Sequence, residues 1–258
     1  MNVFVEFFLA AGIIVRPAIV AAALFLFWLG LRRAGFDGRA RTLAWLSVAV
    51  PLIAWFILVA QLGRAGVFQP RLDAPAPTIP FAIVIPLATG LILLTRSKTF
   101  AAFADATPPS WLIGVQVYRV FGAVFIAQWA EGNLPGVFAL PAGFGDVLVG
   151  ALAIPVALYV RSNARGGRWA AVAWNLLGIA DLIDAVTLGF LSAPGRFQML
   201  AFDHPNLLVG TYPLVMIPAF AVPFSLILHG LSLWQLRRVG RHDATSRTQL
   251  GFRAAARE

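Results

Sequence analysis

The chain has 258 residues, of which 60% are hydrophobic and only 12% are charged. So low a charged fraction excludes an ordinary soluble domain. The formal net charge of +9 would suit nucleic acid. However, the basic residues gather in short segments between long apolar runs, so we expect a lipid bilayer and no nucleic acid as the partner.

Seven apolar runs reach the ~20 residues that a helix needs to cross a hydrocarbon core of ~30 Å. The alternating pattern of a membrane β-barrel is absent. We therefore predict an all-α, polytopic membrane bundle of seven transmembrane helices over residues 1–236. The remaining residues, 237–258, are rich in arginine and are predicted to form a disordered cytoplasmic tail held against anionic lipid. The predicted spans are residues 7–31, 42–62, 79–95, 111–130, 143–160, 169–191 and 207–236.

The distribution of basic residues predicts the orientation. Fifteen Lys and Arg residues lie in the tail and in the loops after the first, third and fifth spans, against three in the remaining loops. Because positive loops stay in the cytoplasm, the N-terminus is predicted outside and the C-terminus inside. The first run has no basic segment before it and no small-residue cleavage site, so we expect an uncleaved anchor. Richness in Arg, Ala and Gly suggests a bacterial inner membrane as the location.

One signature occurs three times along the chain. A Gly-x-Phe turn follows an apolar run, and Ile-Pro appears about twenty residues later in the next run. We interpret this pattern as one leading helix followed by three repeated helical hairpins, whose prolines kink helices around a central site. The alternative stays open that these are chance matches, because membrane helices carry Pro and Gly freely. The turns are Gly66-Val67-Phe68, Gly136-Val137-Phe138 and Gly195-Arg196-Phe197, and the prolines are Pro86, Pro155 and Pro218.

Charged residues inside the spans point to a buried polar site. A charge at the bilayer centre costs about 2.5–3.5 kcal/mol, so each should have a partner or a purpose. Asp181 and Asp184 are three residues apart and share one helix face. Arg119 lies ~6 Å from the depth of Asp181, within reach of an arginine side chain, so we predict contact with one of the two aspartates. The alternative is a structural ion pair that only fixes helix register.

Further polar residues surround this pair. Arg16 of the first span lies near the depth of Asp184. Asp146 follows a glycine-rich stretch at the start of the fifth span, where it either caps the helix or guards the mouth of a site. Gln116 and Asn175 add hydrogen-bonding groups, as do Tyr118 and Gln128. Because three carboxylates meet two arginines, one carboxylate is left over and could carry a labile proton, as a proton relay requires.

Several kinds of site are absent from the sequence. There is no cysteine, and so no disulfide, thiolate metal site or thiol nucleophile. The only lysine, Lys98, lies in a predicted loop, which excludes a retinal Schiff base. His204 and His229 lie too far apart to ligate one haem. We expect no cofactor and no metal, and a metal site formed by Asp146, Asp184 and His204 is the disfavoured alternative.

These observations favour a transporter, channel or proton-linked permease with an intramembrane Arg/Asp site. The alternative is a non-catalytic membrane subunit that assembles with copies of itself or with another membrane protein. An intramembrane enzyme acting on a lipid ranks third, and no residue is predicted to be catalytic. The predicted residues for binding substrate, ion or proton are Asp181, Asp184, Arg119, Asp146, Arg16, Asn175 and Gln116.

Overall fold

The computed structural model of the chain describes residues 3–70 and 78–255, and every regular element in this part is helical. Seven of the described helical segments are long and apolar enough to cross a membrane. This confirms the all-α class and the number of candidate spans, while insertion and orientation stay predictions. The elements are α1 (Val3–Arg33), α2 (Gly38–Arg64), α3 (Ile79–Arg96), α4 (Lys98–Ala106), α5 (Ser110–Gly114), η1 (Val115–Gly122), α6 (Ala123–Ala130), α7 (Gly136–Arg161), α8 (Gly167–Ser192), η2 (Ile217–Ala221) and α9 (Val222–Ala255).

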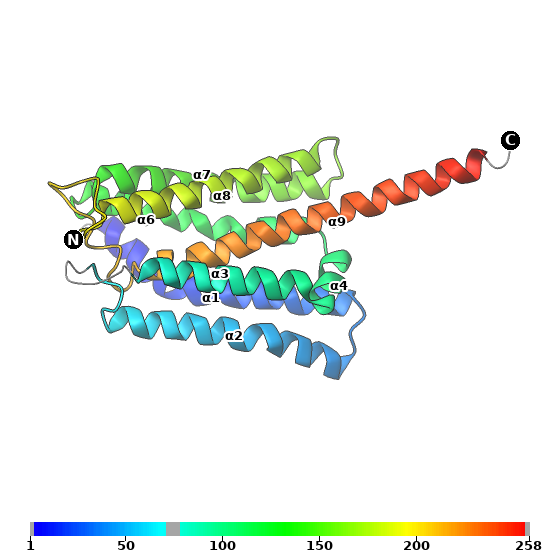
Figure 1. Cartoon of the computed structure of the whole chain (residues 1–258), viewed down its shortest axis with the longest axis horizontal. Helices are drawn as coiled ribbons and strands as arrows, with labels where there is room; N and C mark the ends of the chain where they lie inside the picture. The colour runs from blue at the N-terminus through cyan, green and yellow to red at the C-terminus, as the bar shows by residue number, and fades with distance from the viewer. Residues whose placement is uncertain (1–2, 71–77, 256–258) are drawn as a thin grey trace.

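The long helices run side by side, and their connections gather at two ends of the bundle (Figure 1). The loops after α2, α6 and α8 lie at one end, which we call the turn end. The loops after α1 and α7 lie at the other, which we call the tail end because α9 projects from it. The Gly-x-Phe signatures that begin at Gly66 and Gly195 lie in turns at the turn end. The signature that begins at Gly136 forms the start of α7 there.

Helix α9 lies between two groups of helices (Figure 1). It packs against α3 and α4 on one side and against α5 and α8 on the other. Helices α1, α2 and α4 pack together, as do α6, α7 and α8 around η1. Helix α1 also packs directly against α6 and η1, so the two groups meet through α9 and beside it.

The core on the α1 side is aromatic and apolar. The ring of Phe27 lies 5.9 Å from that of Phe100 and 5.0 Å from that of Phe103. Both of the latter belong to α4, a helix in the segment that the sequence analysis treated as a loop. Ser97 caps α4 by accepting a hydrogen bond from the Phe100 amide at 3.2 Å. Phe100, Phe103 and Ala104 are spaced to cover one face, which explains why this short segment folds onto the bundle.

The helices differ from the predicted spans at three boundaries. Helix α7 begins at Gly136 rather than at residue 143, because Pro135 precedes the first turn and the glycine-rich stretch continues the helix. The seventh span begins at Ile217 rather than at residue 207. The intervening segment forms turns that include Pro213, so Pro213 kinks no helix. At the other end, α9 continues through Ala255 instead of ending at residue 236.

The fourth span is not one regular helix. It consists of α5, the 3₁₀ segment η1 and α6, which follow one another without a break. A 3₁₀ segment is wound more tightly than an α-helix and is unusual at this length. The seventh span likewise starts with the π-helical turn η2, which contains Pro218. Both irregular segments lie next to the polar interior, so regular backbone is lost where the candidate site lies.

Candidate functional site

Arg119 is the centre of the buried polar interior. It lies on η1 and is 3% exposed. Its Nε donates to Asp146 Oδ1 at 2.8 Å, and its Nη2 donates to Asp181 Oδ2. Its Nη1 donates to the Gly178 carbonyl at 3.3 Å. One guanidinium therefore joins α7 and α8 through two carboxylates and a carbonyl oxygen.

His229 of α9 completes the site. Its Nε2 lies 3.1 Å from Arg119 Nη1, and its Nδ1 lies 2.9 Å from Asn175 Oδ1. Because arginine can only donate, Nε2 must accept, so the proton of the neutral ring lies on Nδ1 and is donated to Asn175. His229 is thus an uncharged link between the ion pairs and α8.

The amide of Gln116 is compatible with this assignment once it is turned by 180°. In the orientation drawn, its Nε2 lies 3.4 Å from His229 Nδ1, so two donors would face each other. Its Oε1 is buried without a hydrogen-bond partner. Turning the amide by 180° exchanges the two atoms and gives Nδ1–H a second acceptor, a choice that heavy-atom positions leave open.

Small residues make room for these side chains. A Cβ on Gly178 would overlap the His229 ring and lie 3.1 Å from Arg119 Nη1. A Cβ on Gly145 would overlap the Asp181 carboxylate, and one on Gly122 would overlap Asp146. The glycines seen in the sequence therefore lie where buried polar side chains approach neighbouring helices.

Polar side chains continue along α9 toward the tail end. Ser225, His229, Ser232 and Gln235 are spaced by three or four residues, so they share one helix face, and each is at most 2% exposed. Asn175 Nδ2 donates to Ser232 Oγ at 3.0 Å. Gln235 Nε2 donates to two backbone carbonyls near the end of α4, at 2.7 and 2.8 Å. The stripe spans about 15 Å of the helix axis.

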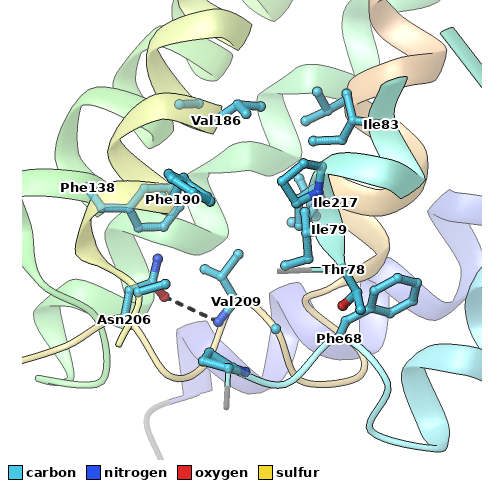
Figure 2. Close-up of a pocket in the computed structure, with 18 of the residues that line it drawn as sticks. Phe68, Thr78, Ile79, Ile83, Phe138, Val186, Phe190, Asn206, Val209 and Ile217 are labelled. Carbon is cyan, nitrogen blue, oxygen red and sulfur yellow. Dashed lines mark hydrogen bonds between the residues drawn. The ribbon is translucent and has the colours of Figure 1, made fainter. Parts of the chain in front are cut away.

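A cavity of about 620 Å³ opens on the other side of the site, toward the turn end. Figure 2 shows its walls, with Phe138 and Phe190 on one side and Ile79 and Ile217 opposite. Asp146 also lines it. Since Asp146 lies ten residues after the start of α7, its backbone is ~15 Å from the turn end of that helix. The cavity thus reaches the ion-pair network.

The structure confirms the predicted contact between Arg119 and Asp181. It places Asp146 in the same network, well past the first turn of α7, so the cap interpretation of Asp146 was wrong. Gln116 and Asn175 lie against His229, as part of the site. No group of three His, Cys, Asp or Glu residues suited to a metal occurs in the described segments.

Two predicted residues lie outside the network. Asp184 of α8 is exposed, and no ion pair joins it to Arg119 in the described residues. Its three-residue offset from Asp181 rotates it by about 60° around the helix, enough to leave the interior. Arg16 is half-buried, and its guanidinium lies against Gly12 of its own helix. It lines a cavity of about 70 Å³ together with Asp146, but no ion pair joins the two in the described residues.

The sequence analysis missed His229, Ser225 and Ser232 as members of the site. It placed the polar interior on the first and the fourth to sixth spans, whereas the seventh contributes a whole face. The spacing of polar residues on α9 was the available signal.

Comparison with known proteins gives one match. Residues 76–237 match the model of a family described as a domain of unknown function (DUF8737). No curated protein and no solved structure matches the chain. The matched segment contains all four residues of the network, Arg119, Asp146, Asp181 and His229, and it leaves α1 and α2 outside.

Proposed function

The chain belongs to this family, whose description assigns no activity, and we propose from the site that it is a proton-linked permease. The observation that carries the proposal is a buried polar path. It leads from a cavity at the turn end, through the ion pairs of Arg119, to the polar stripe of α9. A purely structural ion pair would need neither the cavity on one side nor the stripe on the other.

The charges of the network suit proton exchange. One guanidinium faces two carboxylates, so the group carries one negative charge in excess. His229 does not add a positive charge, because it accepts a hydrogen bond from Arg119. A proton taken up by either carboxylate would make the group neutral and weaken one ion pair. This is the kind of change that can bias a helix bundle between two arrangements.

The irregular segments supply places where such a rearrangement could occur. Arg119 lies on the 3₁₀ segment η1, and the π-helical turn η2 lines the cavity. Both kinds of segment are associated with hinges and functional sites because their hydrogen bonds are less regular than those of an α-helix. In the predicted orientation, the cavity faces outside and the α9 stripe leads toward the cytoplasm.

The test is proton movement in vesicles that contain the purified protein and a pH-sensitive dye. A panel of cationic, neutral and anionic solutes is added, and internal pH is followed. We expect at least one class of solute to accelerate proton movement. Asp181→Asn should abolish the effect because Arg119 and Asp146 then balance each other and the group has no excess negative charge to take up a proton. Asp184→Asn, on the same helix but outside the network, should behave as the wild type.

Equal proton movement in empty and protein-containing vesicles across the whole panel would overturn the proposal. So would full activity of Asp181→Asn, or an equal loss in both variants. Thermal unfolding of each variant in detergent separates lost function from lost folding. If Asp181→Asn unfolds, His229→Gln tests the same path, since its amide can accept from Arg119 and donate to Asn175 but cannot carry a proton.

A second candidate function, a subunit of a membrane assembly, is favoured by Asp184. This carboxylate lies among exposed apolar residues of α8, such as Ile183, which is 57% exposed. A partner helix that supplies a donor to Asp184 would explain its position. Native mass spectrometry of gently extracted protein distinguishes the two: a stable partner that is lost with Asp184→Asn supports the subunit function.

A further inference from the structure

The cavity at the turn end has the size and walls of a small-molecule site. Ligand pockets typically measure about 300–1,000 Å³ and are lined mainly by apolar side chains with a few polar groups. This one measures about 620 Å³. Aromatic rings line it together with aliphatic side chains, and these rings are those of Phe68, Phe125, Phe138, Phe190 and Phe197. Its walls therefore suit the apolar body of an organic molecule.

The walls come from elements that are distant in sequence. Phe138 of α7 and Phe190 of α8 face Ile79 of α3 across the cavity (Figure 2). Val209, from the loop after α8, and Ile217 of η2 close further sides. Because five separate segments contribute, a movement of any one would change the shape of the cavity. The sequence alone could not bring these segments together.

Asp146 gives the inner part of the cavity a negative charge. Its Oδ1 accepts from Arg119, but no hydrogen bond to its Oδ2 exists among the described residues. Its side chain keeps 14% of its surface exposed, whereas Arg119 keeps 2%. Asp146 lines this cavity as well as the smaller one of about 70 Å³, whereas Arg119 lines only the smaller one. A molecule in the cavity would meet the carboxylate and not the arginine.

The neighbouring charges leave this negative potential uncompensated. Arg119 is shared between Asp146 and Asp181, so one carboxylate charge is in excess. The Tyr118 hydroxyl forms a hydrogen bond with the Ser225 hydroxyl, and the neutral His229 accepts a hydrogen bond from Arg119. Arg16 lies against its own helix and does not line this cavity.

In the part of the chain that the structure describes, the only other charged residue along the lining is at the mouth of the cavity. Among the described residues, Arg196 lines the cavity in the loop after α8, where it is exposed. Its guanidinium lies 5.2 Å from the ring centre of Phe197. A cation that enters would therefore pass Arg196, which stacks on the Phe197 ring, and would then reach the acidic Asp146. The charge at the inner end decides the preference, because it is the more desolvated of the two.

We infer that the cavity binds a lipophilic organic cation, with the apolar body between the Phe138, Phe190 and Ile79 walls and the charge next to the Asp146 carboxylate. This inference rests on the proposed permease function and names its substrate class. Proton and organic cation would then compete for the same carboxylate. Binding of one would release the other, and the transport cycle would be an exchange.

Two probes of nearly the same shape and opposite charge test the inference. Tetraphenylphosphonium is a lipophilic cation, and tetraphenylborate is the matching anion. Equilibrium dialysis measures the binding of each probe to purified protein in discs of zwitterionic lipid, with empty discs as the blank. We expect saturable binding of the cation to the wild type and none of the anion. Asp146→Asn should weaken cation binding at least tenfold, and Asp184→Asn should leave it unchanged.

A second variant keeps the test valid if Asp146→Asn does not fold. Val186→Phe adds a ring inside the cavity and leaves every charge in place (Figure 2). It should also weaken cation binding at least tenfold. Binding of the anion as tight as that of the cation would overturn the inference. Wild-type affinity in both Asp146→Asn and Val186→Phe would overturn it too.

The proton-movement assay tests the permease function, and the dialysis assay tests the substrate class, so a negative result in one does not decide the other. Solute-driven proton movement without any saturable binding of tetraphenylphosphonium would refute the substrate class and leave the permease standing. Binding that depends on Asp146, in a protein that moves no protons with any solute, would refute the permease and leave the cation site standing.

Discussion

The first and second parts of the bundle bury different kinds of side chain. Among the described residues, every buried polar or charged side chain lies at or after Thr107, and α1 to α4 bury none. The early part instead packs rings and aliphatic groups, such as Phe27 against Phe103. The matched family segment, residues 76–237, contains all of the buried polar residues and omits α1 and α2.

Within one fold, the early helices are held by apolar packing, and the later helices contain the buried polar network. An apolar interior holds helices by close contact and tolerates exchange of one hydrophobic group for another. A buried polar network tolerates little, because each unpaired group costs its full desolvation energy. We therefore expect substitutions in the two parts to have different signatures, even where they destabilise the bundle to a similar extent.

The largest effect is expected from Arg119→Ala. Its removal leaves Asp146 and Asp181 facing each other without a cation, and breaking a buried ion pair costs about 3–5 kcal/mol. Thermal unfolding in detergent measures the loss. The double variant Arg119→Ala with Asp181→Asn should recover part of it. Arg32→Ala, at an exposed arginine of α1, is the control and should stay at the wild-type value. Strict additivity of the two substitutions would show that the residues are not coupled.

Phe103→Ala tests the apolar part. Phe103 contacts the rings of Phe27 and Phe100 and is 3% exposed, so its truncation should cost about 3 kcal/mol. Binding of tetraphenylphosphonium should keep its wild-type affinity at a temperature where the variant is folded, since Phe103 does not line the cavity. A selective loss of binding at unchanged stability would contradict the division into two parts.

Gly178→Ala should have a smaller effect, of about 2 kcal/mol, from overpacking. The added methyl group would displace the His229 ring and crowd Arg119 Nη1. Solute-driven proton movement should fall along with stability, because the same atoms form the proposed path. Gly38→Ala is the matched control: Gly38 begins α2 and has open space around its missing Cβ. If both variants matched the wild type in proton movement, the link through His229 would be dispensable.

The smallest effect is expected from Asp105→Asn. Asp105 accepts from Arg238 at the tail end and joins α4 to α9, but the side chains keep 41% and 32% of their surface exposed. Surface ion pairs contribute about 0–1 kcal/mol, and salt screens them. The unfolding temperature should change little, and that change should vanish at high salt. A large, salt-independent loss would mean that this contact is as important as the buried network.

The sequence by itself determined the helical class, the number of candidate spans and the pairing of Arg119 with one of the two aspartates of the sixth span. Length and hydropathy are local properties, and a charge inside an apolar run must find a partner whatever the fold. It also showed that Gly66 and Gly195 lie in turns, because turn residues act over a few neighbours.

Only the tertiary structure decided which carboxylates join the network and where the cavity lies. Asp181 and Asp184 look equivalent in sequence, yet a rotation of about 60° around α8 leaves one inside and the other exposed. Asp146 looked like a helix cap until α7 proved to begin ten residues earlier. His229 belongs to the network because α9 lies between the two groups of helices and presents one face to Arg119. Packing sets helix rotation and order, and these depend on contacts between residues far apart in the chain.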